Sequence, residues 1–305
     1  MDLKLIFLIN FSIFFLISNL INISAATDLD SHPNLILLPE NCGVIEEESE
    51  ISDKIRKITA GPRELRFMAR LQYDTEEPRF RCTGTLISEN YVLAAAHCQR
   101  SSLLSVRLGE HNVETELDCK EDGKDCNDPV QDISVKNVTI HENFQSRRVA
   151  NDIALIRLAH PADVKKNNVQ PICLPITSEL RNAVNKQGIF SAWGNPSPTT
   201  LYKTVLDINE ERKTCEDFYS KFNANVTEEV ICATSKNNLN SCKGDAGAPL
   251  FQKLKIGENK KYVLLGFSSA GVQTENDCED KKDSGGSLYT NVPKYMKWIL
   301  DHLEP

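Results

Sequence analysis

The chain has 305 residues, of which 40% are hydrophobic and 26% charged, a composition typical of folded proteins and unlike disordered or collagen-like chains. Its formal net charge of −8 argues against a nucleic-acid-binding protein, which normally carries a basic face. Its ten cysteines are an even number and too many for an ordinary enzyme of a reducing compartment.

The N-terminus carries the only long apolar run of the chain. Residues 5–23 are mostly apolar, begin next to Lys4, and lead into the small residues Ser24, Ala25 and Ala26. This order is typical of a secretory signal peptide, so we predict that residues 1–26 are removed. A membrane anchor is the alternative, but no basic stop-transfer cluster follows. Export would explain the cysteines, because disulfides form in an oxidising compartment.

Residues 27–57 are polar and acidic and lack a periodic apolar pattern. The charge run at 46–50 indicates a solvent-exposed linker, with a docking role as the alternative. Cys42 lies in this segment, and a cysteine in a flexible part of a secreted protein normally has a partner elsewhere. We therefore expect the segment to be tethered to the main domain.

From Ile58 onward the sequence shows short runs of β-branched and aromatic residues, separated by turn signals. The predicted strands are 67–73, 83–87, 91–95, 106–108, 133–140, 153–158, 188–193, 230–233, 262–268 and 287–291. This spacing indicates an all-β sandwich or barrel pair. Only the end is expected to be helical: Pro293 suits a first turn, and Tyr295, Trp298, Ile299 and His302 recur at helical spacing.

Three segments could carry chemistry together. His97 follows a predicted strand and a run of small residues, and Asp152 begins an apolar strand. Residues 242–249 form a glycine-punctuated turn of the kind that presents a nucleophile and an oxyanion hole. A single histidine or aspartate is more often structural. The order histidine, aspartate, turn, with cysteines beside the first and third, is specific.

With these motifs, the chain from about Ile58 to its end resembles the trypsin/chymotrypsin-like serine protease family. Further matching segments lie at 171–175, 191–194 and 288–292. Residues 129–133 and the pair Cys119/Cys126 resemble arthropod clip-domain proteases, although we expect no clip knot because only Cys42 precedes Ile58. The resemblance implies two packed antiparallel β-barrels with a C-terminal helix over 58–305, after a light-chain or pro-segment at 27–57.

The resemblance also implies a role for each motif. His97 matches the general base, and Asp152 matches the carboxylate that fixes the histidine tautomer. Ala246 stands where the family has its nucleophilic serine, and the N–H groups of Gly244 and Ala246 match the oxyanion hole. Because a methyl group offers neither an attacking oxygen nor a proton, no acyl-enzyme can form, and we expect a pseudoprotease.

Nearby serines are poor substitutes for the missing nucleophile. Ser241 would line the specificity pocket, and Ser268 and Ser269 lie on the strand that borders the cleft. Each would have to move much further than the roughly 1 Å that near-attack geometry tolerates.

The substrate pocket implied by the resemblance departs from the trypsin pattern as well. Asn240 occupies the floor position, where trypsin-like members have an aspartate that binds Arg or Lys. Gly271 keeps one of two glycines at the pocket mouth, Ser287 replaces the other, and Ala270 replaces an aromatic residue. We therefore expect a narrowed pocket without an ion pair for basic substrates.

Family members are activated by cleavage before a sequence similar to Ile58-Thr59-Ala60-Gly61. The basic pair Arg56-Lys57 precedes that sequence here, and Asp245 is present to receive the new ammonium group of Ile58. We expect cleavage after Lys57, which would order nearby loops through a buried ion pair. The alternative is that the basic pair is simply part of an exposed linker.

The cysteine spacing alone cannot select a connectivity, but the resemblance implies one that uses all ten. The implied pairs are Cys42–Cys173, Cys82–Cys98, Cys119–Cys126, Cys215–Cys232 and Cys242–Cys278. A metal site is the alternative use of cysteine, but the paired spacing typical of zinc sites is missing. We expect no metal and no cofactor.

Two Asn-x-Thr patterns, at Asn137 and Asn225, are candidate glycosylation sites, and Asn225 is favoured because it lies in a polar loop-like stretch. The loop Glu114–Asp128 is rich in carboxylates. Related proteases sometimes bind calcium in the matching loop, but we favour a solvated acidic loop held by Cys119 and Cys126.

Together these features predict a secreted, non-catalytic serine protease homologue. We expect it to act as an adaptor, cofactor or decoy in an extracellular protease cascade, such as arthropod prophenoloxidase activation and melanisation, in innate immunity or venom. Its expected partners are extracellular proteins such as cascade proteases or their zymogens, with no nucleic acid and no membrane. The alternatives are an active trypsin-like endopeptidase of unusual specificity and a recognition protein for microbial surfaces.

Overall fold

The computed structural model describes residues 29–46, 48–51, 57–75, 80–99, 102–120, 123–145, 149–183, 185–194, 199–210, 212–235, 245–271 and 286–305. The predicted signal peptide, Arg56, residues 240–244 and Cys278 lie outside these residues.

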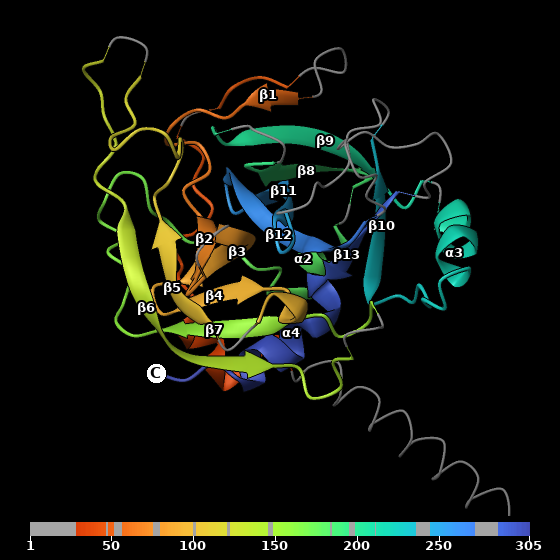
Figure 1. The fold of residues 1–305 in the computed structure, drawn as a ribbon. Helices are drawn as coiled ribbons and strands as arrows, with labels where there is room; N and C mark the ends of the chain where they lie inside the picture. Colours follow the sequence, from red (N-terminus) through yellow and green to blue (C-terminus); the bar gives the residue numbers. More distant parts are fainter. Residues whose placement is uncertain are drawn as a thin grey trace, which may run out of the picture.

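Six antiparallel strands close into a first barrel in the order β2-β3-β4-β7-β6-β5 (Figure 1). Their bounds are β2 (Met68–Tyr73), β3 (Phe80–Ser88), β4 (Tyr91–Ala94), β5 (Leu103–Leu108), β6 (Gln131–Ile140) and β7 (Ala154–Leu158). Along β6, Asp132 and Lys136 are exposed whereas Ile133 is buried, as expected where one strand face meets water. Strand β4, which leads into His97, is buried along its whole length.

A second barrel follows the order β9-β10-β13-β12-β11-β8 and is closed by pairing of β8 with β9. Its strands are β8 (Gln187–Ala192), β9 (Tyr202–Ile208), β10 (Val230–Thr234), β11 (Pro249–Ile256), β12 (Asn259–Ala270) and β13 (Ser287–Asn291). The short strand β1 (Lys57–Thr59) adds to β9. The prediction of an all-β fold of two antiparallel barrels with a C-terminal helix is thereby confirmed.

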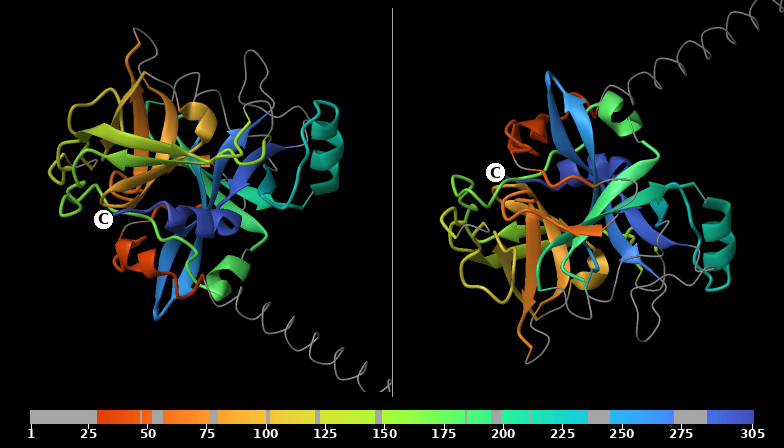
Figure 2. Two further views of the ribbon diagram at one scale, coloured as in Figure 1. Left: turned by 90° about the horizontal axis from the view of Figure 1, so that it is seen from below. Right: turned by 90° about the horizontal axis from the view of Figure 1, so that it is seen from above.

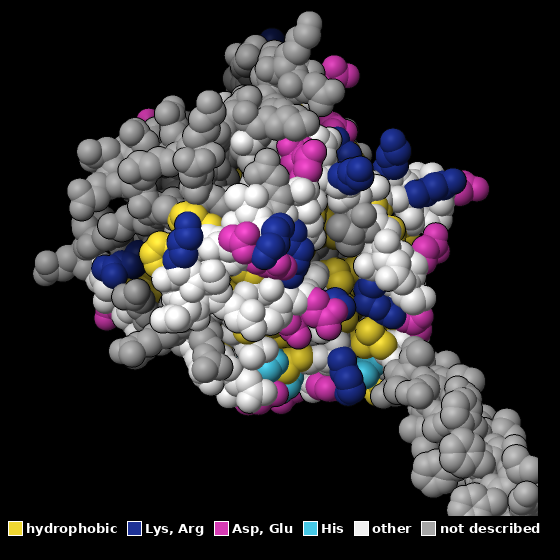
Figure 3. Space-filling view, turned by 90° about the vertical axis from the view of Figure 1, so that its right-hand side faces the viewer, with side chains coloured by type: hydrophobic (Ala, Val, Ile, Leu, Met, Phe, Trp, Pro, Cys, Tyr) yellow, Lys and Arg dark blue, Asp and Glu magenta, His cyan; other side chains and the backbone are white. Residues whose placement is uncertain are grey.

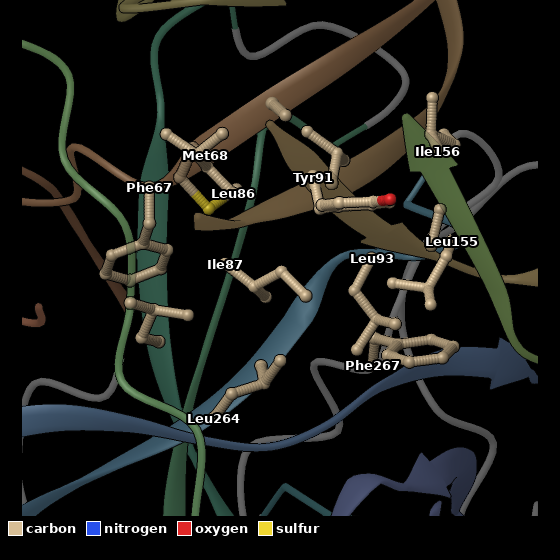
Figure 4. Packing of buried hydrophobic residues seen from close by; sticks show 14 of the residues in the cluster. Phe67, Met68, Leu86, Ile87, Tyr91, Leu93, Leu155, Ile156, Leu264 and Phe267 are labelled. Atoms are coloured by element: carbon tan, nitrogen blue, oxygen red, sulfur yellow. The ribbon is translucent and has the colours of Figure 1, made fainter. Parts of the chain in front are cut away.

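One hydrophobic cluster joins the two barrels (Figure 4). Leu93 of β4 and Leu155 of β7 lie next to Phe267 of β12, and all three are at most 1% exposed. Burying such a side chain stabilises a fold by about 1.5–3 kcal/mol. Because both barrels contribute to this cluster, their relative position is fixed by packing, and so is any site built between them.

The C-terminal helix α4 (Val292–Asp301) confirms the predicted helix. A proline occupies its first turn, and Tyr295, Trp298 and Ile299 are buried on one face. The indole N–H of Trp298 donates to Glu142 at 3.0 Å.

The expectation that only the C-terminus is helical is wrong, because α2 (Ser178–Asn182) and α3 (Arg212–Ser220) are also present. In α3, Cys215 and Tyr219 lie one turn apart and are both buried, and Cys215 forms a disulfide with Cys232 of β10. This cross-link holds a short, mostly polar helix against the second barrel. The apolar pattern of the helix is too weak to predict it from the sequence alone.

The N-terminal segment contains a short helical turn that its sequence pattern did not indicate. A 3₁₀ helix, η1 (Pro33–Leu37), packs next to α4 (Figure 2). The amide of Asn34 donates to the carbonyls of Leu300 at 2.8 Å and Leu303 at 3.1 Å, and His32 contacts Asp301. These bonds join the two ends of the described chain.

Two carboxylates of the acidic run form ion pairs with the domain while the described acidic residues of the run stay exposed. Glu46 pairs with Arg66 at 3.2 Å, and Glu48 pairs with Lys253. The partners lie far along the chain, so the local sequence pattern could not reveal them.

Four of the five disulfides implied by the family resemblance are present in the described residues. They are Cys42–Cys173, Cys82–Cys98, Cys119–Cys126 and Cys215–Cys232. The fifth pair, Cys242 and Cys278, lies outside those residues. The first disulfide attaches the N-terminal segment to the domain.

Candidate functional site

His97 lies in the short helical turn η2 (Ala96–Cys98), directly after strand β4. The alanines that precede it are fully buried, which lets the backbone enter the space between the barrels. The Cys82–Cys98 disulfide ties this turn to β3. The imidazole itself stays 34% exposed, so it borders solvent while its backbone is fixed.

Asp152 precedes β7 and is 2% exposed. Its carboxylate accepts from the backbone N–H of His97 at 2.9 Å and contacts the Nδ1 atom of the same residue at 2.7 Å. The hydroxyl of Ser269 donates to it at 2.5 Å, and Thr290 donates to the Asp152 carbonyl at 2.9 Å. A buried carboxylate is thus satisfied by hydrogen bonds from both barrels.

This arrangement fixes the chemistry that the imidazole can perform. Because Asp152 is an acceptor at Nδ1, the neutral ring carries its proton there and offers Nε2 as a base. The sequence predicted this pair, but it suggested Ser269 only as a poor substitute for the missing nucleophile. The structure places its hydroxyl on the Asp152 carboxylate instead.

Ala246 lies in the turn ahead of β11, and this turn is fastened between the barrels. The N–H of Thr83 on β3 donates to the Ala246 carbonyl at 2.8 Å. The next residue, Gly247, has φ +79°, and a Cβ there would lie 2.1 Å from the Thr83 carbonyl oxygen and 3.5 Å from the Ala95 nitrogen. Only glycine fits this position, so the turn that carries Ala246 packs directly against β3 and close to the backbone of Ala95, two residues before His97.

Asp245, the expected partner of a new N-terminus, is 1% exposed and has other partners in this uncleaved chain. Its carboxylate accepts from the N–H of Gly194 at 3.0 Å and from the hydroxyl of Tyr202 at 3.2 Å. Burial and then the Asp245 charge raise the pKa of Tyr202 well above its usual value, so the hydroxyl remains a donor. Ile58 lies within β1, in register with Lys203 of β9.

The expected pocket residues are only partly described. Gly271 follows β12, and Ser287 is fully buried at the start of β13, opposite Ala233 of β10. Asn240 and the oxyanion-hole residue Gly244 lie outside the described residues.

Carboxylates of the acidic loop are engaged by the chain itself. Asp118 is 8% exposed and accepts from the backbone N–H groups of His111 and Asn112 and from the Thr115 hydroxyl. Asp125 pairs with Arg63 and with Lys120. These contacts favour a loop held by its own hydrogen bonds.

Among the residues that the structure describes, Cys82, His97 and Cys98 have the composition of a metal site. The two sulfur atoms are joined in a disulfide and offer no thiolate. The two candidate glycosylation sites, Asn137 on β6 and Asn225 after α3, are both exposed.

Comparison with known proteins places this site in a family. The family model described as Trypsin matches residues 55–299. The chain belongs to the trypsin family. It is 36% identical to serine protease grass of Drosophila melanogaster over 248 residues, 77% of this chain and 63% of that protein. Phenoloxidase-activating factor 3 of Holotrichia diomphalia is 37% identical over 238 residues, 73% and 64% of the two chains.

Solved structures agree with this trypsin-family assignment. The crystal structure of the Drosophila Grass clip serine protease of the Toll pathway superposes with a TM-score of 0.74 at 31% identity, over 91% of this chain and 77% of that one. Mouse neuropsin gives a TM-score of 0.62 at 27% identity, over 86% and 100% of the chains. The predicted resemblance to arthropod clip-domain proteases is confirmed by these matches.

The chain spans slightly less than two thirds of the length of the grass and phenoloxidase-activating-factor relatives. The CLIP domain-containing serine protease HP8 of Bombyx mori is 36% identical over 301 residues and is covered to 76%. Within the part of the chain that the structure describes, no helix is both long and apolar enough to cross a bilayer.

Proposed function

We propose that this protein is a secreted, non-catalytic serine protease homologue that acts by binding within an extracellular protease cascade. One feature carries the proposal: Ala246 stands where the family has its nucleophilic serine, in a turn whose Ala246 carbonyl accepts from the backbone N–H of Thr83 on β3. Nucleophilic catalysis of peptide cleavage needs an oxygen or sulfur atom there, with a proton that the histidine removes.

The remaining machinery cannot replace that atom. In a protease that acts through a triad, losing the nucleophile lowers kcat by about 10⁶-fold and leaves about 10³–10⁴ over the uncatalysed rate. Ser269 is already bonded to Asp152, and Ser268 is fixed through its backbone to Gly247 and Ala248. Neither hydroxyl is free to take the position of Ala246 without moving its strand.

The pocket residues support the same reading. Asn240 has no charge to pair with an Arg or Lys side chain, and Ser287 fills a position where the family uses glycine. A protease of this specificity class depends on both features. A chain selected for binding rather than for cleavage would be expected to lose both features.

The names of the relatives suggest the kind of cascade. They include a Drosophila melanization protease, a spaetzle-processing enzyme and a phenoloxidase-activating factor. A chain of the same fold can present the same surface to the same class of partner. We therefore propose cascade proteases or their zymogens as partners, with an adaptor, cofactor or decoy role.

Secretion is supported by the apolar N-terminal run and by four disulfides, which persist in oxidising compartments. We further propose residues 27–57 as a pro-segment and cleavage after Lys57, which would free the Ile58 amine for Asp245. The Gly194 and Tyr202 contacts of Asp245 would then have to rearrange.

The function is tested with the purified protein cleaved after Lys57. A fluorophosphonate probe should leave it unmodified in an intact-mass measurement, and a stoichiometric adduct would overturn the proposal. Added to insect haemolymph, the protein should change the rate of melanisation. His97→Ala should change that rate as strongly as the wild type, since binding does not use the base. An effect lost in His97→Ala, or no effect of either protein, would contradict the proposed role.

Cleavage after Lys57 should leave two chains joined by the Cys42–Cys173 disulfide. The cleaved protein should run on denaturing gels as one band without reductant and as two bands with it. Cys42→Ser/Cys173→Ser should release the N-terminal segment without reductant.

The matched control for Cys42→Ser/Cys173→Ser is Cys119→Ser/Cys126→Ser, which removes a disulfide that lies wholly on one side of the cleavage position. That variant should behave as the wild type. Release of the segment from the wild type without reductant would contradict the tethered pro-segment.

A further inference from the structure

An exposed phenylalanine follows helix α3 on the outer side of the second barrel. Phe222 is 64% exposed, more than any other aromatic side chain among the described residues. Figure 3 looks onto the side of the molecule that bears α3, where hydrophobic side chains reach the surface between charged ones. A single exposed apolar residue is ordinary in proteins, so exposure alone assigns nothing.

The backbone holds this phenylalanine in a defined position. Asn223 has φ +57°, its N–H donates to the Ser220 carbonyl at 3.1 Å, and the N–H of Ala224 donates to the Tyr219 carbonyl at 3.2 Å. These bonds and the left-handed residue form a Schellman cap that ends α3 and reverses the chain. Ala224 and Tyr219 complete the cap by packing in one hydrophobic cluster.

Asn225 follows immediately after this reversal. Ala224 and Val226 on either side of it are 9% and 8% exposed and belong to the same cluster. Because side chains alternate along an extended segment, Asn225 points outward between them, and its side chain is exposed. Thr227 completes the Asn-x-Thr pattern of a glycosylation acceptor.

The ring of Phe222 contacts a second aromatic ring while most of its surface stays exposed. Its centroid lies 5.4 Å from that of Phe218, which is partly buried against the core. A largely exposed ring held by such a contact, three residues before an exposed acceptor, suits the apolar C–H face of a pyranose. Such a face is attracted by apolar contact and by the negative charge of the ring face.

We propose that Asn225 carries an N-linked glycan whose first N-acetylglucosamine packs on the ring of Phe222. The proposal rests on the secretion proposed above. The donor is a lipid-pyrophosphate-linked oligosaccharide of the secretory pathway. The Asn225 amide nitrogen bonds to C1 of the sugar and loses one proton to a base. The C1–O bond breaks, and its electron pair leaves with the pyrophosphate.

The second acceptor provides the contrast. Asn137 lies within strand β6, opposite Arg157 of β7, and the residues before it are Val135 and Lys136. None of the three residues before Asn137 is aromatic. A glycan there would modify the surface without covering an exposed ring.

The test uses the full chain, secreted by cells that make only oligomannose glycans, with Asn137→Gln present throughout so that Asn225 alone is modified. One portion is treated with an endoglycosidase that leaves the first sugar, and another with an amidase that releases the whole glycan as a glycosylamine and leaves aspartate at position 225. Intact mass verifies both products. The protein that keeps one sugar should unfold about 2–4 °C higher than the stripped protein, a shift typical of one modest stabilising contact in a domain of this size.

Phe222→Ala should reduce this difference to under about 1 °C, whereas Leu104→Ala, at a position that is 47% exposed and far along the chain, should leave it unchanged. Because Phe222 is mostly exposed, its replacement should fold. An equal difference in Phe222→Ala and the parent would overturn the stacking. Secretion without a glycan on Asn225 would overturn this inference alone, and failure of export would overturn it together with the proposed secretion.

Discussion

Replacing Ala246 with serine should convert a chain that a fluorophosphonate leaves unmodified into one that it labels at a single residue. The acid–base pair that would activate the new hydroxyl is in place, since the Nδ1 atom of His97 lies 2.7 Å from Asp152 and Nε2 is left as the acceptor. The serine oxygen would attack phosphorus and fluoride would leave. Intact mass of the protein cleaved after Lys57 would give the extent and rate of labelling.

The matched control is Ala246→Ser combined with His97→Ala, which should label at least about 10³-fold more slowly, because nucleophile and base act as a unit. Peptides with Arg or Lys should remain poor substrates of the single variant, since Asn240 and Ser287 are unchanged. Absence of labelling would contradict a competent His97–Asp152 pair, and efficient cleavage of basic peptides would contradict the pocket assignment.

Replacing Lys203 with methionine should lower the free energy of unfolding by about 3–5 kcal/mol, the usual effect of removing one partner of a buried ion pair. The side chains of Lys203 and Glu64 are 1% and 0% exposed, and the ammonium group also donates to the Ser49 carbonyl at 2.6 Å. Without it, the Glu64 carboxylate loses a buried cationic partner, although the Ser49 hydroxyl and the Gly61 N–H still donate to it. Denaturant unfolding with intact disulfides would measure the loss.

Two variants control for this prediction. Glu64→Gln/Lys203→Met removes both charges and should lose clearly less stability than the single variant. Lys213→Met breaks the exposed pair with Asp217, whose side chains are 80% and 62% exposed, and should leave the unfolding curve unchanged. A loss in Lys203→Met no larger than in Lys213→Met would show that the buried pair contributes nothing.

Much of the barrel fold could be predicted because most strands are runs of apolar and β-branched residues with turn signals between them. The two long strands that escaped prediction, β9 and β11, have polar residues facing inward. Lys203 and Asp207 in β9 and Gln252 in β11 are all at most 4% exposed. Their burial depends on partners supplied by other elements, such as Glu64 and residue 185, which no local pattern contains.

The candidate site likewise has features that local motifs predict and features that depend on residues far along the chain. The order of His97, Asp152 and the turn at Ala246 could be found from motifs, since each lies on its own strand end. The contacts of Ser269 with Asp152 and of Tyr202 with Asp245 could not, because each joins residues more than 40 positions apart whose types are common at many surface positions.

The position of η1 beside α4 affects the order in which the chain can fold during synthesis. Asn34 leaves the ribosome early, but the carbonyls that it binds, those of Leu300 and Leu303, are synthesised 266 and 269 residues later. A domain generally folds as a unit. A nascent chain stalled before Leu300 would have the strands of both barrels available, while η1 would still lack the carbonyls that Asn34 binds.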